Sequence, residues 1–139
     1  MIVAHGTLVD TNVLLDVLTE DPVWLRWSLE ALEQAAEAGP LFINPIIYAE
    51  VSIRFSTIED LDDALPPADF RRLPLPWDAA FLAGKAFRSY RRKGGVRSST
   101  LPDFYIGAHA AVEGLSVLTR DGSPYRTYFP TVTLVAPPP

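Results

Sequence analysis

Four short apolar runs alternate with longer stretches whose apolar residues recur at helical spacing. The runs predict β-strands at residues 7–9, 41–43, 116–118 and 132–135. Strands that alternate with helices are typical of a parallel sheet whose two faces are both covered. The pattern therefore predicts an α/β fold, specifically a three-layer α/β/α domain with a mostly parallel central sheet.

Capping residues and helix breakers predict the helices of the first half. One face of the first helix carries Val13, Leu14, Val17 and Leu18. Asp21-Pro22 predicts the start of a second helix that runs to about residue 38. Its inward face would carry Trp24, Trp27, Leu29 and Leu32. Asn44-Pro45 predicts the start of a third helix, which includes Glu50, and Ser56-Thr57 caps a short acidic helix through residue 65.

The second half continues the alternation. Residues 73–76, Leu-Pro-Leu-Pro, predict an extended connector or a short edge strand. A helix beginning at Asp78 places Ala80, Phe81, Gly84 and Phe87 at core spacing and ends at Gly94-Gly95. Ser99 or Thr100 would cap the next helix, residues 103–113, which is apolar almost all round and should be buried.

Composition limits the possible classes of protein. At 139 residues the chain is expected to form one domain, residues 1–136, with a loose tail at residues 137–139. The absence of cysteine excludes disulfides, thiol catalysis and zinc–thiolate sites. No apolar run reaches the roughly 18 residues of a membrane span, and the N-terminus lacks the basic region of a signal peptide. These features predict a cytoplasmic protein.

Charge is distributed unevenly along the chain. Residues 1–70 hold 13 acidic and 2 basic residues, whereas residues 71–139 hold 4 acidic and 10 basic residues. Five bases gather within ten residues: Arg88, Arg91, Arg92, Lys93 and Arg97. Such a cluster can bind a phosphate backbone, although Lys and Arg also favour the end of a solvated helix. The segment is therefore a candidate RNA-binding surface.

Four carboxylates occupy positions where parallel α/β sheets build their sites: Asp10, Glu50, Asp103 and Asp121. Asp10 and Asp121 follow predicted strands, and Glu50 and Asp103 lie near predicted helix starts, so all four can meet outside the carboxyl ends of the strands. Converging carboxylates repel one another unless they share a proton or bind a hard metal such as Mg²⁺ or Mn²⁺. The four residues therefore predict a metal site.

Each carboxylate also has a purely structural interpretation. Asp10 can act as a helix N-cap, Glu50 can be a solvated helix residue, and Asp103 can favour the helix dipole. Asp121-Gly122 is a common turn signal. Each signal is weak alone, and the combination of the four in this order is much stronger.

The chain resembles the PIN-domain ribonucleases, and most closely the VapC-like toxins of bacterial toxin–antitoxin pairs. The resemblance covers nearly the whole chain and is carried by the segments Val-Asp-Thr-Asn-Val-Leu-Leu-Asp (9–16), Ile-Tyr-Ala-Glu-Val (47–51), Pro-Asp-Phe-Tyr-Ile-Gly-Ala-His-Ala (102–110) and Leu-Thr-Arg-Asp (118–121). Phe104, Tyr105 and His109 are bulkier than the small residues of many relatives, a difference that bears on substrate preference.

The resemblance implies that Asp10, Glu50, Asp103 and Asp121 form the catalytic metal site. Thr11 or Asn12 would support this site through hydrogen bonds, and Thr119 would orient the last loop. The implied activity is Mg²⁺- or Mn²⁺-dependent endoribonuclease cleavage of tRNA, rRNA or mRNA. The implied partners are a cognate VapB-like antitoxin and a second copy of the chain.

Phosphodiester hydrolysis fits these residues independently of the resemblance. A divalent metal can acidify a bound water and stabilise charge on the phosphate. Asp10, Asp103 and Asp121 would be ligands, directly or through water, and Glu50 a further ligand or a general base. His109 is expected to pack in or beside the buried helix rather than act as a general acid. Asp16 would support the site at most indirectly.

Two other functions remain open. One is another metal-dependent phosphohydrolase with Asp10 as a covalent nucleophile. The absence of a second carboxylate two residues later, where Asn12 stands, weighs against it. The other is a non-catalytic RNA-binding module of the same fold, against which the presence of all four carboxylates argues.

Overall fold

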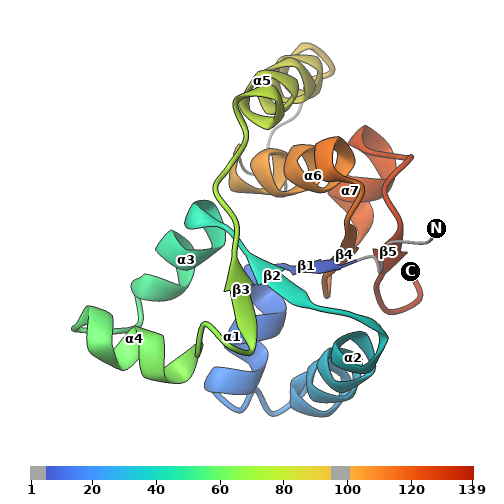
Figure 1. Cartoon of the computed structure of the whole chain (residues 1–139). Helices are drawn as coiled ribbons and strands as arrows, with labels where there is room; N and C mark the ends of the chain where they lie inside the picture. Colours follow the sequence, from blue (N-terminus) through green and yellow to red (C-terminus); the bar gives the residue numbers. More distant parts are fainter. Residues whose placement is uncertain (1–5, 95–100) are drawn as a thin grey trace, which may run out of the picture.

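The computed structural model describes residues 6–94 and 101–139. A five-stranded, all-parallel sheet with the order β3-β2-β1-β4-β5 lies at its centre (Figure 1). The strands are β1 Thr7–Val9, β2 Leu41–Ile43, β3 Phe70–Arg72, β4 Ser116–Leu118 and β5 Leu134–Val135. The predicted α/β fold with a parallel sheet is confirmed.

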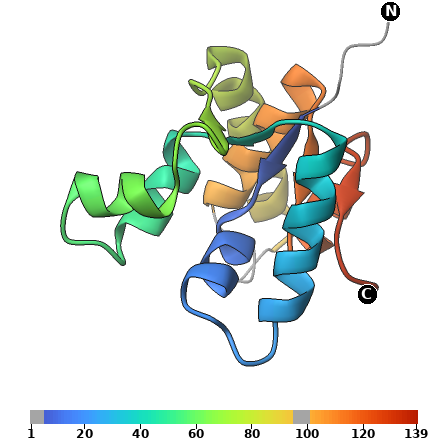
Figure 2. The same ribbon diagram turned by 60° about the horizontal axis from the view of Figure 1, so that its bottom comes forward.

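Helices cover both faces of this sheet. They are α1 Thr11–Leu18, α2 Leu25–Ala38, α3 Pro45–Ser52, α4 Ile58–Ala64, α5 Trp77–Arg92, α6 Leu101–Glu113 and α7 Ser123–Tyr128. Figures 1 and 2 show α1 and α2 on one face and α6 on the other, with α5 packed on the side of α6 that faces away from the sheet. The arrangement is the predicted three-layer α/β/α architecture.

Burial explains why the central strands are continuously apolar. Leu8 and Val9 of β1, Ile43 of β2, and Val117 and Leu118 of β4 are fully buried. A strand that is covered on both faces cannot alternate polar and apolar residues without burying polar groups. The predicted burial of α6 is also confirmed, since Phe104 and the run 106–110 are buried. The residue that would cap α6, Ser99 or Thr100, lies outside the described residues.

The prediction for the start of the second helix was wrong by a few residues. The Asp21 carboxylate accepts hydrogen bonds from the backbone N–H groups of Val23 and Trp24, both at 2.9 Å, so it organises a turn. The helix α2 begins only at Leu25. Its buried face carries Ser28, Ala31, Leu32 and Ala35, and Leu29, which was expected inside, is exposed.

The prediction for the inward face of α5 was correct for Phe87 and wrong for Phe81 and Gly84. Ala79 and Ala83 are buried, whereas Phe81 and Gly84 are exposed. Helix α5 packs on α6 through Phe87, whose ring lies 5.5 Å from that of Phe104. Small residues at the contact let the two helices approach closely, and the larger residue Phe81 is left on the opposite face.

The peripheral elements differ in smaller ways. The edge strand is β3 at Phe70–Arg72, and residues 73–76 form only the connector that follows it. The last strand is restricted to Leu134–Val135, and the short helix α7 was not predicted. Residues 136–139 continue without regular secondary structure. None of the helices in the described part of the chain is long and apolar enough to cross a membrane.

Candidate active site at the carboxyl edge of the sheet

The candidate site begins where two neighbouring strands end. Val9 of β1 lies in register with Leu118 of β4, and the residues that follow them are Asp10 and Thr119. The Asp10 backbone N–H donates to the Leu118 carbonyl at 2.8 Å, which extends the ladder to the sheet edge. The carboxyl ends of parallel strands are where open α/β sheets bind ligands. The topology therefore places Asp10 at the centre of that edge.

Three donors hold the Asp10 carboxylate. Its Oδ1 accepts the backbone N–H of Thr11 at 2.7 Å, as the N-cap of α1. Its Oδ2 accepts the hydroxyls of Thr119 at 2.8 Å and of Tyr125 at 2.9 Å. A carboxylate has about four lone-pair sites, so one remains for a further partner. Asp10 is therefore the N-cap of α1, as its structural interpretation predicted. Its remaining lone pair can still accept a further ligand.

The environment of Asp10 favours its neutral form. Only 4% of the residue is exposed, and burial raises the pKa of the carboxyl. The three hydrogen bonds lower the pKa but do not cancel the effect of burial, and repulsion from Glu50 raises it further. No Lys or Arg within the described residues forms an ion pair with Asp10. Arg120 interacts with the charge of Asp10 only at longer range, because its guanidinium is paired with Asp16.

Thr11 joins Asp10 to the second predicted carboxylate. The Thr11 hydroxyl donates to Glu50 Oε1 at 2.6 Å, while the same residue's backbone N–H donates to Asp10. Glu50 belongs to α3, which begins after β2 with Asn44 as its N-cap, where the Asn44 side chain accepts the Ile47 N–H at 2.9 Å. The predicted supporting role of Thr11 therefore has a structural basis: one residue holds both carboxylates.

Tyr125 lies close to three of the four carboxylates. It donates to Asp10, and the negative charges of Asp10, Asp103 and Glu50 all raise the pKa of its phenol, which burial raises most. The phenol therefore stays protonated and keeps its role as a donor. Sequence reasoning missed Tyr125, because a tyrosine in an unpredicted helix carries no signal of its own. Tyr125 thus contacts Asp10 directly and lies within electrostatic range of Glu50 and Asp103.

Asp121 behaves differently from the other three. It is exposed, and its Oδ1 accepts the Ser123 backbone N–H at 3.2 Å at the start of α7. Its backbone N–H donates to the Thr119 hydroxyl oxygen at 3.1 Å. Within residues 6–94 and 101–139, no three His, Cys, Asp or Glu side chains are grouped closely enough to hold a metal ion. The four carboxylates share one edge of the sheet without forming a closed set of ligands.

Asn12 and Thr119 lock the loop that carries Asp121. The Asn12 side chain donates to the Thr119 hydroxyl at 3.3 Å and accepts the Arg120 backbone N–H at 3.0 Å. Thr119 in turn donates to Asp10. The predicted orienting role of Thr119 and the supporting role of Asn12 both correspond to these contacts.

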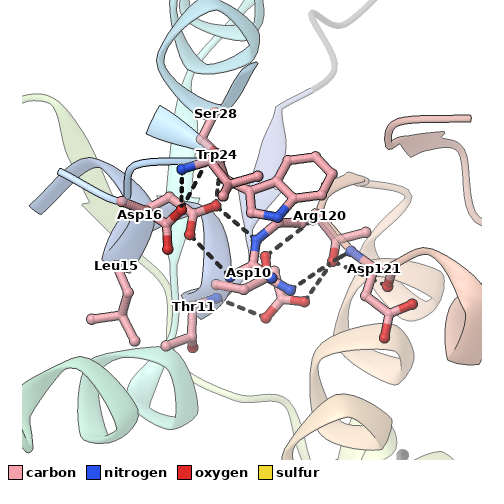
Figure 3. Close-up of polar contacts among 12 residues, drawn as sticks. Asp10, Thr11, Leu15, Asp16, Trp24, Ser28, Arg120 and Asp121 are labelled. Carbon is pink, nitrogen blue, oxygen red and sulfur yellow. Dashed lines mark hydrogen bonds and ion pairs between the residues drawn. The ribbon is translucent and has the colours of Figure 1, made fainter. Parts of the chain in front are cut away.

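An ion pair between buried Asp16 and half-buried Arg120 lies next to the site. Arg120 donates from Nε and Nη2 to the two oxygens of Asp16 at 2.8 and 2.9 Å, and the Ser28 hydroxyl donates to Asp16 at 2.7 Å. Figure 3 shows Asp16 between Ser28 and Arg120, with Trp24 beside the guanidinium. A lone aspartate inside the apolar run 13–18 could have signalled a cation partner, but the sequence does not say which one.

The remaining predicted residues lie outside this cluster. His109 is fully buried, as expected, with Nδ1 3.0 Å from the Asn44 side chain and Nε2 2.7 Å from Glu113. The basic residues at the end of α5 are exposed: Arg88, Arg91, Arg92 and Lys93. The fifth, Arg97, lies outside the described residues.

The sequence matches the PIN domain family over residues 7–130. The chain belongs to the PIN domain family. Comparison with curated proteins gave no significant match.

Solved structures similar to this PIN domain come from several bacteria. A chain of the VapBC2 complex from Rickettsia felis, bound to a DNA fragment from its promoter, aligns with a TM-score of 0.70 at 18% identity, covering 94% of this chain and 97% of that one. A chain of a toxin–antitoxin complex from Klebsiella pneumoniae aligns with a TM-score of 0.65 at 24% identity, covering 92% and 96%. A chain of FitAcB from Neisseria gonorrhoeae gives 0.62 at 23%, covering 92% and 95%. These likenesses establish the fold.

The donor set of this PIN domain suits a hard divalent cation. All the candidate ligands are carboxylates, which suit Mg²⁺ and Mn²⁺, and Asp10 is buried without an ion-pair partner among the described residues. Mg²⁺ usually keeps several waters and takes only one or two protein carboxylates. An open arrangement of Asp10, Glu50 and Asp103 is therefore compatible with such an ion.

Proposed function

We propose that the protein is a Mg²⁺- or Mn²⁺-dependent endoribonuclease and the toxin of a toxin–antitoxin pair. The observation that carries this proposal is Asp10: a carboxylate at the end of the central strand, buried, with a raised pKa and with Glu50 beside it. Such a site is costly for a fold to retain unless a cation is bound there for part of the time.

Asp10, Glu50 and Asp103 would hold the cation, directly or through water. When bound, the cation supplies charge stabilisation at the phosphate and a more acidic water. Of these three carboxylates, Glu50 is the candidate for a general base, because the Thr11 hydroxyl donates to its Oε1 at 2.6 Å and orients it. Asp121, at the rim of the site, would act through water.

The surrounding hydroxyls position Asp10. Thr119 and Tyr125 both donate to Oδ2 and leave a lone pair on Oδ1, whose other partner is the Thr11 N–H. This arrangement fixes the direction in which the carboxylate can accept a ligand. The exposed bases at the end of α5, Arg88, Arg91, Arg92 and Lys93, would contact RNA phosphates together with Arg97.

The proposed antitoxin partner rests on the similar solved structures. One is a toxin–antitoxin complex from Klebsiella pneumoniae, and another is a member of the VapBC family of toxin–antitoxin systems from Mycobacterium tuberculosis. We expect a cognate VapB-like antitoxin to bind this chain and to block the acidic edge, and a second copy to form a homodimer. Co-expression with the neighbouring open reading frame, followed by purification of the complex, tests the first expectation.

One experiment tests the activity. Pooled cellular RNA is incubated with wild type or Asp103→Asn, each in Mg²⁺ and in EDTA. Cleavage that needs the metal and is lost in the variant supports the nuclease and its acidic site. RNA binding without cleavage by folded wild type in Mg²⁺ would favour a binding module instead.

A further inference from the structure

His109 is a fully buried imidazole that joins two helices of the candidate site. It belongs to α6, whose first turn carries Asp103, and its Nδ1 lies 3.0 Å from the side-chain nitrogen of Asn44. Its Nε2 lies 2.7 Å from Oε2 of Glu113, at the end of α6. Asn44 is the N-cap of α3, the helix that carries Glu50. The imidazole therefore connects the helices of two proposed metal ligands.

The backbone of α3 decides which ring nitrogen carries the proton. The Asn44 Oδ1 accepts the Ile47 backbone N–H at 2.9 Å, and this N–H can only donate, so the orientation of the amide is fixed. The NH₂ group of Asn44 therefore faces His109 and donates to Nδ1. An imidazole that accepts at Nδ1 carries its proton on Nε2, which donates to the Glu113 carboxylate. Each donor in this chain of hydrogen bonds, from Ile47 to Glu113, thus meets an acceptor.

Helix α3 depends on this cap for its start. It has only eight residues, Pro45–Ser52, and a helix of that length has little stability of its own. The first backbone N–H groups of a helix have no partner inside it, and the Asn44 side chain satisfies one of them. Asn44 is itself buried, so water cannot readily replace His109 as the acceptor of its amide. The acceptor at Nδ1 of His109 thus keeps the cap in place.

The position of Glu50 follows from where α3 begins. Glu50 lies in the second turn of α3, and its Oε1 accepts the Thr11 hydroxyl at 2.6 Å. A hydrogen bond depends steeply on distance and angle, so a small shift of the helix start weakens it. Helix α3 packs on α1, which carries Thr11, and on α6, which carries Asp103. The contact between Asn44 and His109 therefore determines how Glu50 lies relative to Asp103.

We propose that His109 is a positioning residue for the nuclease reaction, which fixes α3 through Asn44 and thereby sets the position of Glu50 relative to Asp103. This inference rests on the proposed function and adds to it a residue outside the group of four carboxylates. His109 acts through Asn44 and transfers no proton to the substrate. An apolar side chain could fill the same space, but it would leave the Asn44 amide without an acceptor in the core, which is costly.

Two substitutions of His109 separate its two hydrogen bonds. The side-chain oxygen in His109→Asn reaches the former position of Nδ1 and can accept from the Asn44 amide. The longer side chain in His109→Gln reaches the former position of Nε2, where it can donate to Glu113 but leaves Asn44 without an acceptor. Both variants remove the ring. The matched control is Thr57→Ala, which removes the N-cap of the neighbouring helix α4, where Thr57 accepts the Asp60 N–H at 3.1 Å.

The first measurements need neither metal nor RNA. Long-range nitrogen–proton NMR spectra of wild type at neutral pH should show His109 with its proton on Nε2. Native-state hydrogen exchange of the Ile47 amide should be about 10-fold faster in His109→Gln than in wild type, because a buried donor without an acceptor destabilises the cap. His109→Asn should keep the rate within about threefold of wild type, since its acceptor is retained. Thr57→Ala should leave the Ile47 rate unchanged.

The cleavage assay uses an oligoribonucleotide that carries the site cut by wild type in pooled RNA, with Mg²⁺ present. His109→Gln should lower kcat about 10-fold with KM little changed, because loss of a group that orients a metal ligand typically costs 10-fold or more. His109→Asn should recover most of kcat. Thr57→Ala should keep the kcat and KM of wild type although it is less stable, so a general loss of stability would not reproduce the pattern.

A proton on Nδ1 of His109 in wild type would overturn the proposal, and this result depends on no variant being folded. Equal Ile47 exchange in His109→Gln and His109→Asn would overturn it as well. A wild-type kcat in folded His109→Gln would refute the link from His109 to Glu50 and leave the nuclease intact. No cleavage by wild type would refute the nuclease, and the Ile47 exchange rates would still decide whether His109 holds the start of α3.

Discussion

Two aspartates of the α1 region, the N-cap Asp10 and Asp16 within the helix, are buried to a similar degree, but their carboxylates have different partners. Asp10 is 4% exposed and Asp16 is 1% exposed. Asp16 receives both arms of the Arg120 guanidinium and the Ser28 hydroxyl. Asp10 receives one backbone N–H and two hydroxyls, and repulsion from the Glu50 carboxylate raises its pKa.

The difference separates a structural charge from a functional one. A buried carboxylate that is paired in a bidentate ion pair has its charge compensated by the protein itself. Asp10 has hydrogen bonds but no ion pair with a Lys or Arg of the described chain, and its pKa is raised, with burial as the main cause. Asp10 lies at the carboxyl edge of a parallel sheet, where ligands bind. A bound cation can compensate a carboxylate there that has no ion-pair partner in the described chain.

Removing the charge of Asp10 should have the largest effect, a loss of RNA cleavage. Asp10→Asn is expected to lower RNA cleavage at least about 1,000-fold, because the metal contributes several kcal/mol of transition-state stabilisation. The rate of cleavage of pooled RNA in Mg²⁺ measures this. The exposed aspartate variant Asp63→Asn is the control and should cleave at the wild-type rate. Full activity of Asp10→Asn would remove Asp10 from the site.

Breaking the compensated pair should act on stability. Arg120→Met leaves Asp16 buried without its cation and is expected to lower the free energy of unfolding by about 3 kcal/mol. Urea unfolding in metal-free buffer measures this. Asp16→Asn/Arg120→Met should recover part of the loss, because an amide at residue 16 can still accept the Ser28 hydroxyl. If Arg120→Met alone were as stable as wild type, Asp16 would not need the charge of Arg120.

Tyr125→Phe tests the hydroxyls that orient Asp10. The change removes one donor to Oδ2 and preserves the ring, which is buried in the core. Removal of a group that orients a metal ligand typically costs 10- to 100-fold, and we expect a loss of about that size in cleavage rate. The variant Tyr128→Phe, in the same helix α7, is the control. Measuring the loss at several Mg²⁺ concentrations separates weaker metal binding from slower cleavage.

The smallest expected effect is that of Mg²⁺ on the stability of the fold, and it should appear only in wild type. If Mg²⁺ compensates the Asp10 charge, Mg²⁺ at ten times its dissociation constant stabilises the folded chain by about 1.4 kcal/mol. For a chain of this size this corresponds to roughly 4–6 °C in the unfolding temperature. Differential scanning fluorimetry in Mg²⁺ and in EDTA measures the shift. Asp10→Asn should show no shift, and an equal shift in that variant would place the ion elsewhere.

The sequence predicted the parts of the fold that depend on local pattern. The apolar runs at residues 7–9, 41–43 and 116–118 are the three central strands, since a strand buried on both faces has no other way to avoid buried polar groups. Asn44-Pro45 and Thr57 predicted helix starts because capping chemistry is local. The failures came where a partner element decides the outcome, as for the inward face of α5.

The sequence by itself determined the alternation of strands and helices, the positions of the four carboxylates on it, and hence the edge of the sheet where they gather. Only the tertiary structure decided which groups of the described chain contact each carboxylate. Tyr125 and Thr119, more than 100 residues away in the sequence, donate hydrogen bonds to Asp10. Asp121 accepts a hydrogen bond from Ser123, and Arg120 forms an ion pair with Asp16. The physical reason is that charge compensation depends on distances between side chains from different elements, and local sequence pattern does not contain those distances.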